Sequence, residues 1–216
     1  MEGQVNNSKI LDSTYVSWIR WRCWLMSRTG EAARLTREVD VKVRVQVDGR
    51  GDFKGGTGLG FLDHALKTFA MHSGMDLEVS GKGDLTHHLV EDLAICMGEA
   101  LSKALGDRVG LKRFGYAYVP MDDALARAVV DLGGRPYFVG ELALTRSNVE
   151  DMKREDLEHF LRSLSEHLKV SLHIHVLYGL DDHHKAEASI KALALALKDA
   201  WTIVGNRTPS VKGTLT

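Results

Sequence analysis

Cysteine, proline and long apolar runs are all scarce in this chain of 216 residues, and each shortage excludes a class of protein. Only Cys23 and Cys96 are present, too few and too far apart for a disulfide framework or a thiolate zinc site. This usage fits a reducing cytoplasm. No run of about 18 apolar residues occurs, so we expect no membrane span. The three prolines leave no rigid linker between domains.

An excess of charge of either sign is lacking as well. The chain has 28 basic and 29 acidic residues and a formal net charge of -1. Such a balance creates no bulk field that would attract nucleic acid or an acidic membrane, so we expect neither as a partner. Any anion must therefore be bound locally. The hydrophobic content of 44% is ample for the packed core of a globular protein.

Residues 1–33 differ in composition from the rest, and we interpret them as a poorly ordered N-terminal extension. Trp18, Trp21 and Trp24 lie here among basic residues, a composition that is also typical of interfacial membrane anchors. A signal peptide is disfavoured because the apolar run is short and no small-residue cleavage site follows. Met26 is an alternative start of the chain.

Apolar periodicity divides the remainder into two similar halves, residues 34–112 and 113–216, which we expect to form one domain. In the first half the pattern predicts a strand over 39–47, a helix from 61, a strand over 75–80, a turn over 81–84 and a helix over 87–105. The second half repeats this order, with strands over 116–119 and 126–132, a helix over 156–168, a strand over 170–178 and a helix over 183–200. Duplicated strands-helix-strand-helix units predict an α+β fold with helices packed on one face of an antiparallel or mixed sheet.

Both halves carry the same histidine pattern. In the first half His64 and His72 precede an HHxxE element, and in the second half His159 and His167 precede another. A single HHxxE element is weak evidence, because helices often carry His and Glu at such spacing by chance. Two copies with matching upstream histidines indicate an internal repeat of metal ligands.

Helical geometry explains how these residues could share metal ions. Residues one turn apart lie on one face of a helix, whereas adjacent histidines point about 100° apart, so one His-His pair can contribute to two ions. The candidate ligands, enough for two sites of three imidazoles and one carboxylate each, are His64, His87, His88, Glu91, His159, His183, His184 and Glu187. This donor set suits manganese, iron or zinc. The sequence neither ranks these metals nor divides the ligands between two ions.

Several motifs, ordered along the chain from about residue 34, resemble those of the imidazoleglycerol-phosphate dehydratase family. They are TGLGFLDH at residues 57–64, the two HHxxE elements, LKRFG at 111–115, GRPY at 134–137 and PSVKG at 209–213. The resemblance implies a fold of the ribosomal protein S5 domain 2-like type and two Mn²⁺ ions per active site. It also implies a 24-subunit homo-oligomer with active sites shared between subunits.

The activity that the resemblance implies belongs to histidine biosynthesis. It is a hydro-lyase reaction that removes water from D-erythro-imidazole-glycerol phosphate and gives imidazole-acetol phosphate. Carried over residue by residue, the resemblance places metal ligands on the same eight positions. It places substrate contacts on Glu38, His72, Arg113, Arg135, Ser210 and Lys212.

Roles follow for some of these positions. Arg113, Arg135 and Lys212 would form the local cationic pocket for the phosphate, which makes the C-terminal segment a phosphate-binding tail. Glu38 is our candidate general base or proton shuttle, and His72 would help to hold the substrate hydroxyl. Thr86 stands before the first His-His pair, where the family usually has an acid, while Asp182 keeps that acid in the second copy. We expect a carboxylate there to hold a ligand imidazole by a hydrogen bond.

Two other functions could use the same ligands. A dinuclear metallohydrolase of a small phosphate ester would use metal-bound hydroxide as its nucleophile. A non-catalytic protein that needs metal for assembly would couple metal binding to oligomerisation. The first would release phosphate from imidazole-glycerol phosphate, and the second would assemble without turnover.

Overall fold

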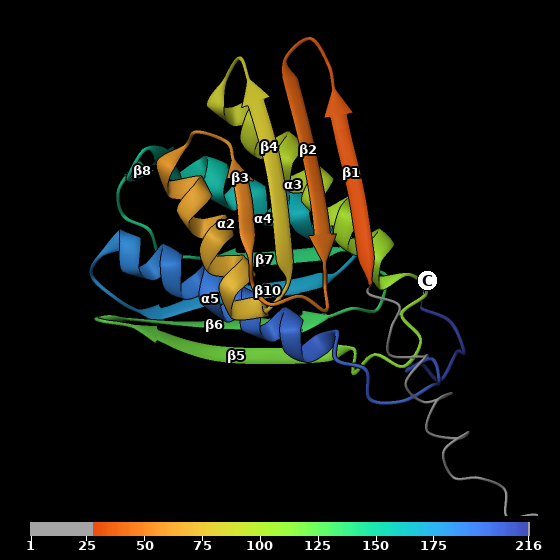
Figure 1. Cartoon of the computed structure of the whole chain (residues 1–216). Coiled ribbons are helices and arrows are strands. Elements are labelled where there is room, and N and C mark those ends of the chain that lie inside the picture. The colour runs from red at the N-terminus through yellow and green to blue at the C-terminus, as the bar shows by residue number, and fades with distance from the viewer. Residues whose placement is uncertain (1–27, 216) are drawn as a thin grey trace, which may run out of the picture.

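The computed structural model describes residues 28–215 of the chain (Figure 1). The three N-terminal tryptophans, Cys23 and Met26 lie outside the described residues. Strand β1 (Thr29–Leu35) pairs along its whole length with β2 (Val39–Gln46). The interpretation of the segment up to residue 33 as a poorly ordered extension is therefore wrong for residues 29–33. Apolar alternation is weak in β1, where Ala32 alone is buried, and so the sequence pattern did not indicate a strand.

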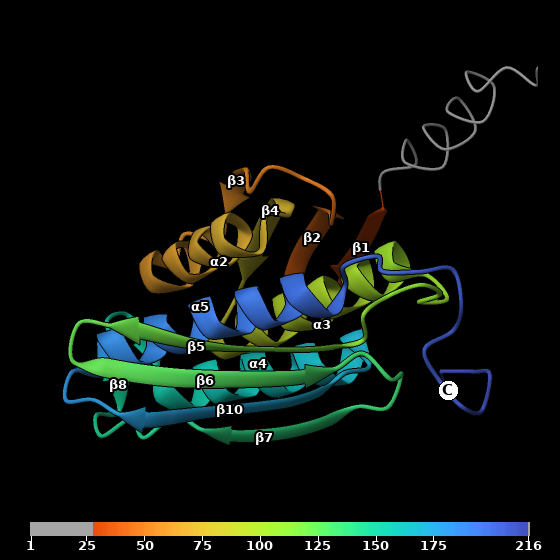
Figure 2. The same ribbon diagram turned by 90° about the horizontal axis from the view of Figure 1, so that it is seen from below.

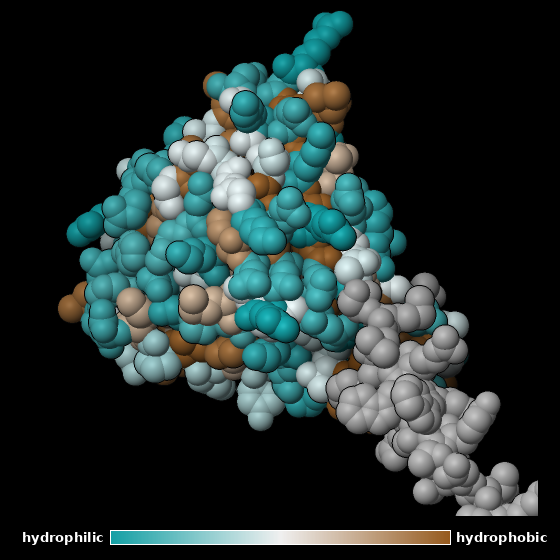
Figure 3. Space-filling view, viewed as in Figure 1, coloured by the Kyte–Doolittle hydropathy of each residue, from teal (hydrophilic) through white to brown (hydrophobic). Residues whose placement is uncertain are grey.

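Two more strands complete a mixed sheet with the order β1-β2-β4-β3. Strand β4 (Asp76–Gly83) is antiparallel to β2, and β3 (Phe53–Gly56) is parallel to β4. The alternate valines of β2 point into the core, as the period-two pattern predicts. Hydrophilic side chains predominate on the face shown in Figure 3, over the outer side of this sheet.

Strand β4 is longer than its sequence indicates. The turn predicted over residues 81–84 is wrong in its first part, because Gly81 and Gly83 pair with Val41 and Val39 of β2. A Cβ atom at either glycine would lie 3.0 Å from the side chain of Leu89 in the following helix. The glycines therefore allow β4 to pack closely against α3, and they do not form a turn.

The second half builds a sheet of the same design, with the order β5-β6-β10-β7. Its strands are β5 (Phe114–Met121), β6 (Ala124–Asp131), β7 (Tyr137–Glu141) and β10 (Ser171–Tyr178). One feature differs between the halves. Only residues 57–59 join β3 to the next helix, whereas residues 142–153 join β7 to its helix and include the small hairpin of β8 (Asn148–Val149) and β9 (Met152–Lys153).

The helices are α2 (Gly60–Ser73), α3 (Thr86–Leu105), α4 (Arg154–Leu168) and α5 (Asp182–Ala200), so the predicted helices are confirmed and each begins one or two residues earlier than expected. They lie between the two sheets, as Figures 1 and 2 show together. Helix α2 packs against α5, and α3 packs against α4. The first helix of each half thus meets the second helix of the other half. No helix within residues 28–215 is long and apolar enough to cross a membrane.

Candidate metal centre

Cross-pairing of the helices gathers the predicted ligands into two clusters. His64 of α2 meets His183 and Glu187 of α5, and we name this set the α2/α5 cluster. His159 of α4 meets His87 and Glu91 of α3, and this set is the α3/α4 cluster. In each cluster the ligand atoms lie within 4.8 Å of one another. The structure therefore brings together six of the eight predicted ligands and divides them three and three.

In the α2/α5 cluster both imidazoles face one carboxylate. The Nε2 atom of His64 lies 3.5 Å from Oε2 of Glu187, and Nε2 of His183 lies 3.3 Å from the same oxygen. Glu187 is largely buried, and its other oxygen lies 2.8 Å from the Nζ atom of Lys191. Burial raises the pKa of Glu187, but Lys191 and His64 outweigh this effect and leave the pKa lowered. The carboxylate is therefore ionised and available to a cation.

The α3/α4 cluster repeats this arrangement with a more exposed carboxylate. Oxygen atoms of Glu91 lie 3.9 Å from Nε2 of His87 and 3.4 Å from Nε2 of His159. The two imidazole rings are 5.0 Å apart between centroids. On the far side of the His87 ring, Nδ1 lies 2.8 Å from Oδ1 of the buried Asp156.

The donor chemistry of both clusters fits a divalent transition metal. Imidazole nitrogens with one carboxylate are typical ligands of manganese, iron and zinc. In both clusters a histidine turns Nε2 toward the shared carboxylate and binds a second carboxylate through Nδ1. Such a bond fixes the ring and leaves the Nε2 lone pair for a metal.

The other two predicted ligands, His88 and His184, lie outside the clusters. Each is adjacent in sequence to a cluster histidine, and its ring centroid is more than 6 Å from that neighbour. The Nδ1 atom of His88 lies 2.8 Å from Asp84, and Nδ1 of His184 binds Asp123. These hydrogen bonds raise the pKa of both histidines. Within the described residues of one chain, neither histidine belongs to a group of three side chains that could hold a metal ion.

Asp182 does not hold a ligand imidazole, so that expectation is wrong. Its carboxylate is buried and accepts hydrogen bonds from the backbone N–H groups of Thr145 and Arg146 and from Nζ of Lys185. Burial raises the pKa of Asp182, but these bonds outweigh it and lower the pKa to about 2. The residue anchors the β7–β8 connection to the start of α5.

The imidazoles are held instead by carboxylates that the sequence reasoning missed. They are Asp84, Asp123, Glu150 and Asp156. Asp84 stands four residues before His88, a spacing that could have indicated the pair. The others are 33 to 69 residues away from their histidines, and no local signal marks them.

Two predicted substrate residues lie at the ligand-bearing helices. Glu38 follows β1, its side chain is exposed, and its Oε2 atom lies 3.9 Å from Nδ1 of His88. His72 is two turns beyond His64 on α2. Burial and the nearby charge of Lys191 lower the pKa of His72, although Glu187 opposes them. The imidazole of His72 is therefore neutral near pH 7.

Arg113, one of the predicted phosphate residues, lies far from His183 of the α2/α5 cluster in the same chain. Arg113 donates its backbone N–H to Ala200, 17 positions after His183 on α5, which corresponds to about 25 Å along the helix. Its guanidinium binds both carboxylate oxygens of Asp131 and the carbonyl of Pro209. Arg135 and Lys212 are exposed, and the Ser210 hydroxyl accepts a bond from the Lys212 backbone.

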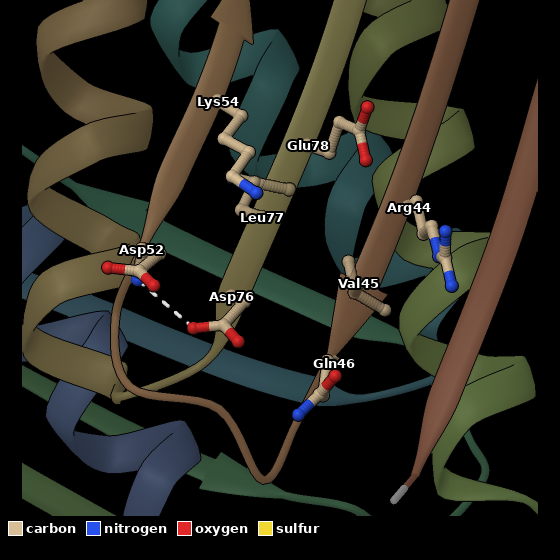
Figure 4. A pocket seen from close by; sticks show the side chains of 8 residues that line it. All are labelled: Arg44, Val45, Gln46, Asp52, Lys54, Asp76, Leu77 and Glu78. Carbon is tan, nitrogen blue, oxygen red and sulfur yellow. Dashed lines mark hydrogen bonds between the residues drawn. The ribbon is translucent and has the colours of Figure 1, made fainter.

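A separate hollow of about 190 Å³ lies on the outer face of the first sheet. Its charged lining includes Arg44, Lys54 and Glu78, and Asp76 accepts the backbone N–H of Asp52 (Figure 4). No histidine lines this hollow. It therefore belongs to the solvated outer surface and not to the metal centre.

Similarity to known proteins shows the family to which the chain belongs. The family model of imidazoleglycerol-phosphate dehydratase matches residues 57–197, a range that contains every cluster ligand. The chain belongs to the imidazoleglycerol-phosphate dehydratase family. This membership confirms the resemblance drawn from the motifs, and with it the expectation of a dehydratase, an enzyme of the hydro-lyase class.

Relatives of this family match nearly over their full length. The imidazoleglycerol-phosphate dehydratase of Chloroherpeton thalassium is 42% identical over 191 residues, which cover 87% of this chain and 98% of the relative. That of Methanothermobacter thermautotrophicus is 48% identical with the same coverage of both chains.

Solved structures of imidazoleglycerol-phosphate dehydratases share the fold. The structure from Staphylococcus aureus has a TM-score of 0.75 and 34% identity, and the match covers 81% of this chain and 99% of that one. The structure from Pyrococcus furiosus, in complex with (S)-C348, has a TM-score of 0.72 and 36% identity, with coverage of 85% and 99%. The expected α+β fold with duplicated units is thereby confirmed.

Proposed function

We propose that this protein removes water from imidazole-glycerol phosphate to give imidazole-acetol phosphate, a step of histidine biosynthesis, with two Mn²⁺ ions per active site. The observation that carries the proposal is the pair of His-His-Glu clusters, one on each cross-pair of helices. The imidazole ring of the substrate has two nitrogen atoms, so two metal sites can hold it from both sides. Fe²⁺ and Zn²⁺ suit the same ligands.

Metal ions bound at the clusters would supply Lewis acidity for the charge that develops on the imidazole. The remaining tasks belong to side chains. Glu38 has an exposed carboxylate beside His88 and would carry the proton as general base or shuttle. His72, neutral near pH 7, would accept a hydrogen bond from the substrate hydroxyl. Arg113, Arg135, Lys212 and Ser210 would bind the phosphate.

An active site shared between copies of the chain accounts for two features. His88 and His184 lie outside the clusters of their own chain, so each could complete a cluster of a neighbouring copy. Arg113, one of the predicted phosphate residues, lies beside Ala200, about 25 Å from His183 along α5 and too far to meet the same small substrate within one chain. We therefore propose a homo-oligomer with shared sites, of 24 subunits as the family resemblance implies. A cytoplasmic location stays a proposal that rests on the sparse cysteines.

Reconstitution tests the activity. Purified protein is stripped with a chelator, reloaded with Mn²⁺, Fe²⁺ or Zn²⁺, and assayed for ketone formation from imidazole-glycerol phosphate. We expect no product from the stripped protein and restored product with Mn²⁺. Release of phosphate would instead identify a metallohydrolase, and metal-dependent assembly without product would identify the non-catalytic alternative.

The role of Glu38 is tested by Glu38→Gln. We expect turnover to fall by about 100-fold or more, since general acid–base catalysis typically contributes factors of this size. Bound metal is measured on the same samples. Normal turnover with intact metal content would exclude Glu38 as the general base.

A further inference from the structure

The β8–β9 hairpin reaches from the second half of the chain to the α2/α5 cluster. It belongs to the connection over residues 142–153, which has no counterpart of this length in the first half. Its tip, Glu150 and Asp151, lines a hollow of about 350 Å³ together with the cluster residues His64 and His183. The tip therefore lies where the cluster opens to the surface.

Glu150 holds the cluster histidine of α5. Its Oε1 atom lies 3.1 Å from Nδ1 of His183, while Nε2 of that ring faces Glu187. The backbone of Glu150 has a φ of 52°, a left-handed conformation that a side-chain-bearing residue other than Asn or Asp adopts at a cost. Backbone strain in this turn therefore falls on Glu150, the same residue whose carboxylate contacts His183.

Asp151 fixes the helix that carries the other cluster histidine. Its two carboxylate oxygens accept the backbone N–H groups of Gly60 and Phe61 at 2.6 and 2.9 Å. These groups belong to the first turn of α2, where the N-cap residue Leu59 provides no side-chain hydrogen bond. Asp151 therefore performs the capping task from another part of the chain, one turn before His64.

The connection itself is anchored at its other end. Thr145 and Arg146 donate backbone hydrogen bonds to the buried Asp182, and Lys185 joins Asp182 to the carbonyl of Ala143. The connection is thus tied to both helices of the cluster, to α5 through Asp182 and to α2 through Asp151.

We propose that the hairpin tip is a positioning element of the α2/α5 metal site, in which Glu150 sets the ring of His183 for metal binding and Asp151 sets the helix that carries His64. Asp156 is its counterpart at the α3/α4 cluster, where it holds Nδ1 of His87 from within α4. Each cluster thus has its own carboxylate that binds Nδ1 of a candidate ligand. The inference rests on the metal-dependent function proposed above.

Calorimetric titration of the stripped full-length protein with Mn²⁺, together with electron paramagnetic resonance to count bound ions, tests this assignment. In Glu150→Gln we expect one of the two ions to bind about 10- to 100-fold more weakly, as is typical when an outer hydrogen-bond partner of a ligand is lost. Asp156→Asn weakens the other ion by a similar factor, and the double variant weakens both. The control is Glu155→Gln, which removes an exposed carboxylate between positions 150 and 156 of the sequence. We expect this variant to bind Mn²⁺ like the unaltered protein.

A second variant distinguishes the effect of the Glu150 carboxylate from the effect of the strained backbone. Glu150→Gly suits a positive φ and removes the carboxylate, so we expect it to fold at least as stably and to lose the same affinity as Glu150→Gln. The proposal is overturned if Glu150→Gln or Glu150→Gly binds both Mn²⁺ ions with unchanged affinity. It is also overturned if Glu150→Gln and Asp156→Asn weaken the same ion. If the unaltered protein binds no divalent ion, the proposed metal function itself fails, a result distinct from both.

Discussion

The two candidate metal clusters have matching residues, but different side chains hold them in place. In the α3/α4 cluster the orienting carboxylate is Asp156, buried on the same helix as the ligand His159. In the α2/α5 cluster it is Glu150, exposed at a strained hairpin tip outside any helix. The repeat thus specifies the ligands twice, whereas each half supplies its own means of holding them.

The ligand-bearing helix starts differ in the same way. Helix α5 begins after Asp181, whose side chain accepts backbone bonds from His183 and His184, and the buried Asp182–Lys185 pair lies within its first turn. Helix α3 begins after Leu85, which provides no side-chain cap, and its first turn has no acidic residue. The helix start that carries the second His-His pair therefore has a side-chain cap, and the start that carries the first pair has none.

The largest expected effect comes from removing the carboxylate of either cluster. Glu187→Ala and Glu91→Ala should each lower turnover more than about 1,000-fold, because Lewis-acid stabilisation by one ion is worth several kcal/mol. Each variant should lose one ion and keep the other. Turnover and bound Mn²⁺ are measured together, with Glu99→Gln as control, since Glu99 is a half-exposed carboxylate of α3 that lies outside both clusters. Retention of turnover by a protein with a single ion would contradict the need for both clusters.

Next in size is the loss of Asp182. Asp182→Ala should lower the free energy of unfolding by about 3 kcal/mol, because the buried Lys185 loses its carboxylate partner. Thr86→Ala at the corresponding place in α3 should change stability by less than about 0.5 kcal/mol. Urea unfolding of the stripped proteins measures both. Equal losses would show that the helix starts do not differ as described.

A pH effect of intermediate size follows from the same carboxyl group. The pKa of Asp182 is lowered to about 2 from an ordinary value of 3.8, so its stabilising contribution is fully present above pH 3.8 and is lost as the pH falls through 2. The contribution amounts to about 2 kcal/mol. Asp182→Asn should therefore show a shallower loss of stability than the unaltered protein between pH 4 and pH 2. Parallel curves of the unfolding free energy in this range would refute the assignment.

The smallest effect concerns the N-caps. Leu85→Ser should stabilise the protein by about 1 kcal/mol, since its hydroxyl can accept a backbone N–H at the uncapped start of α3. Asp181→Ala should cost about the same amount at α5. Thermal unfolding of the stripped proteins checks both changes. If Leu85→Ser brings no gain, water already satisfies the start of α3 as well as a side chain would.

Much of the fold could be predicted because the pattern is local. The alternation Val39, Val41, Val43 and Val45 predicted β2, and helical spacing predicted α2 to α5 within two residues. β1 was missed because its apolar alternation is weak, and the end of β4 was missed because its glycines pack against Leu89 of α3 and do not form a turn. Cross-pairing of the helices could not be predicted, since it depends on how two sheets enclose them.

The sequence by itself determined which residues can bind metal, because imidazole and carboxylate side chains repeat at helical spacing in both halves. Tertiary structure alone decided how they are divided, with His64 joined to His183 and Glu187, and His159 joined to His87 and Glu91. It also decided that Asp182 anchors a connection while Glu150 and Asp156 hold the imidazoles. The physical reason is that ligand type is a property of single residues, whereas a hydrogen-bond partner tens of residues away is selected only by the packing of helices and loops.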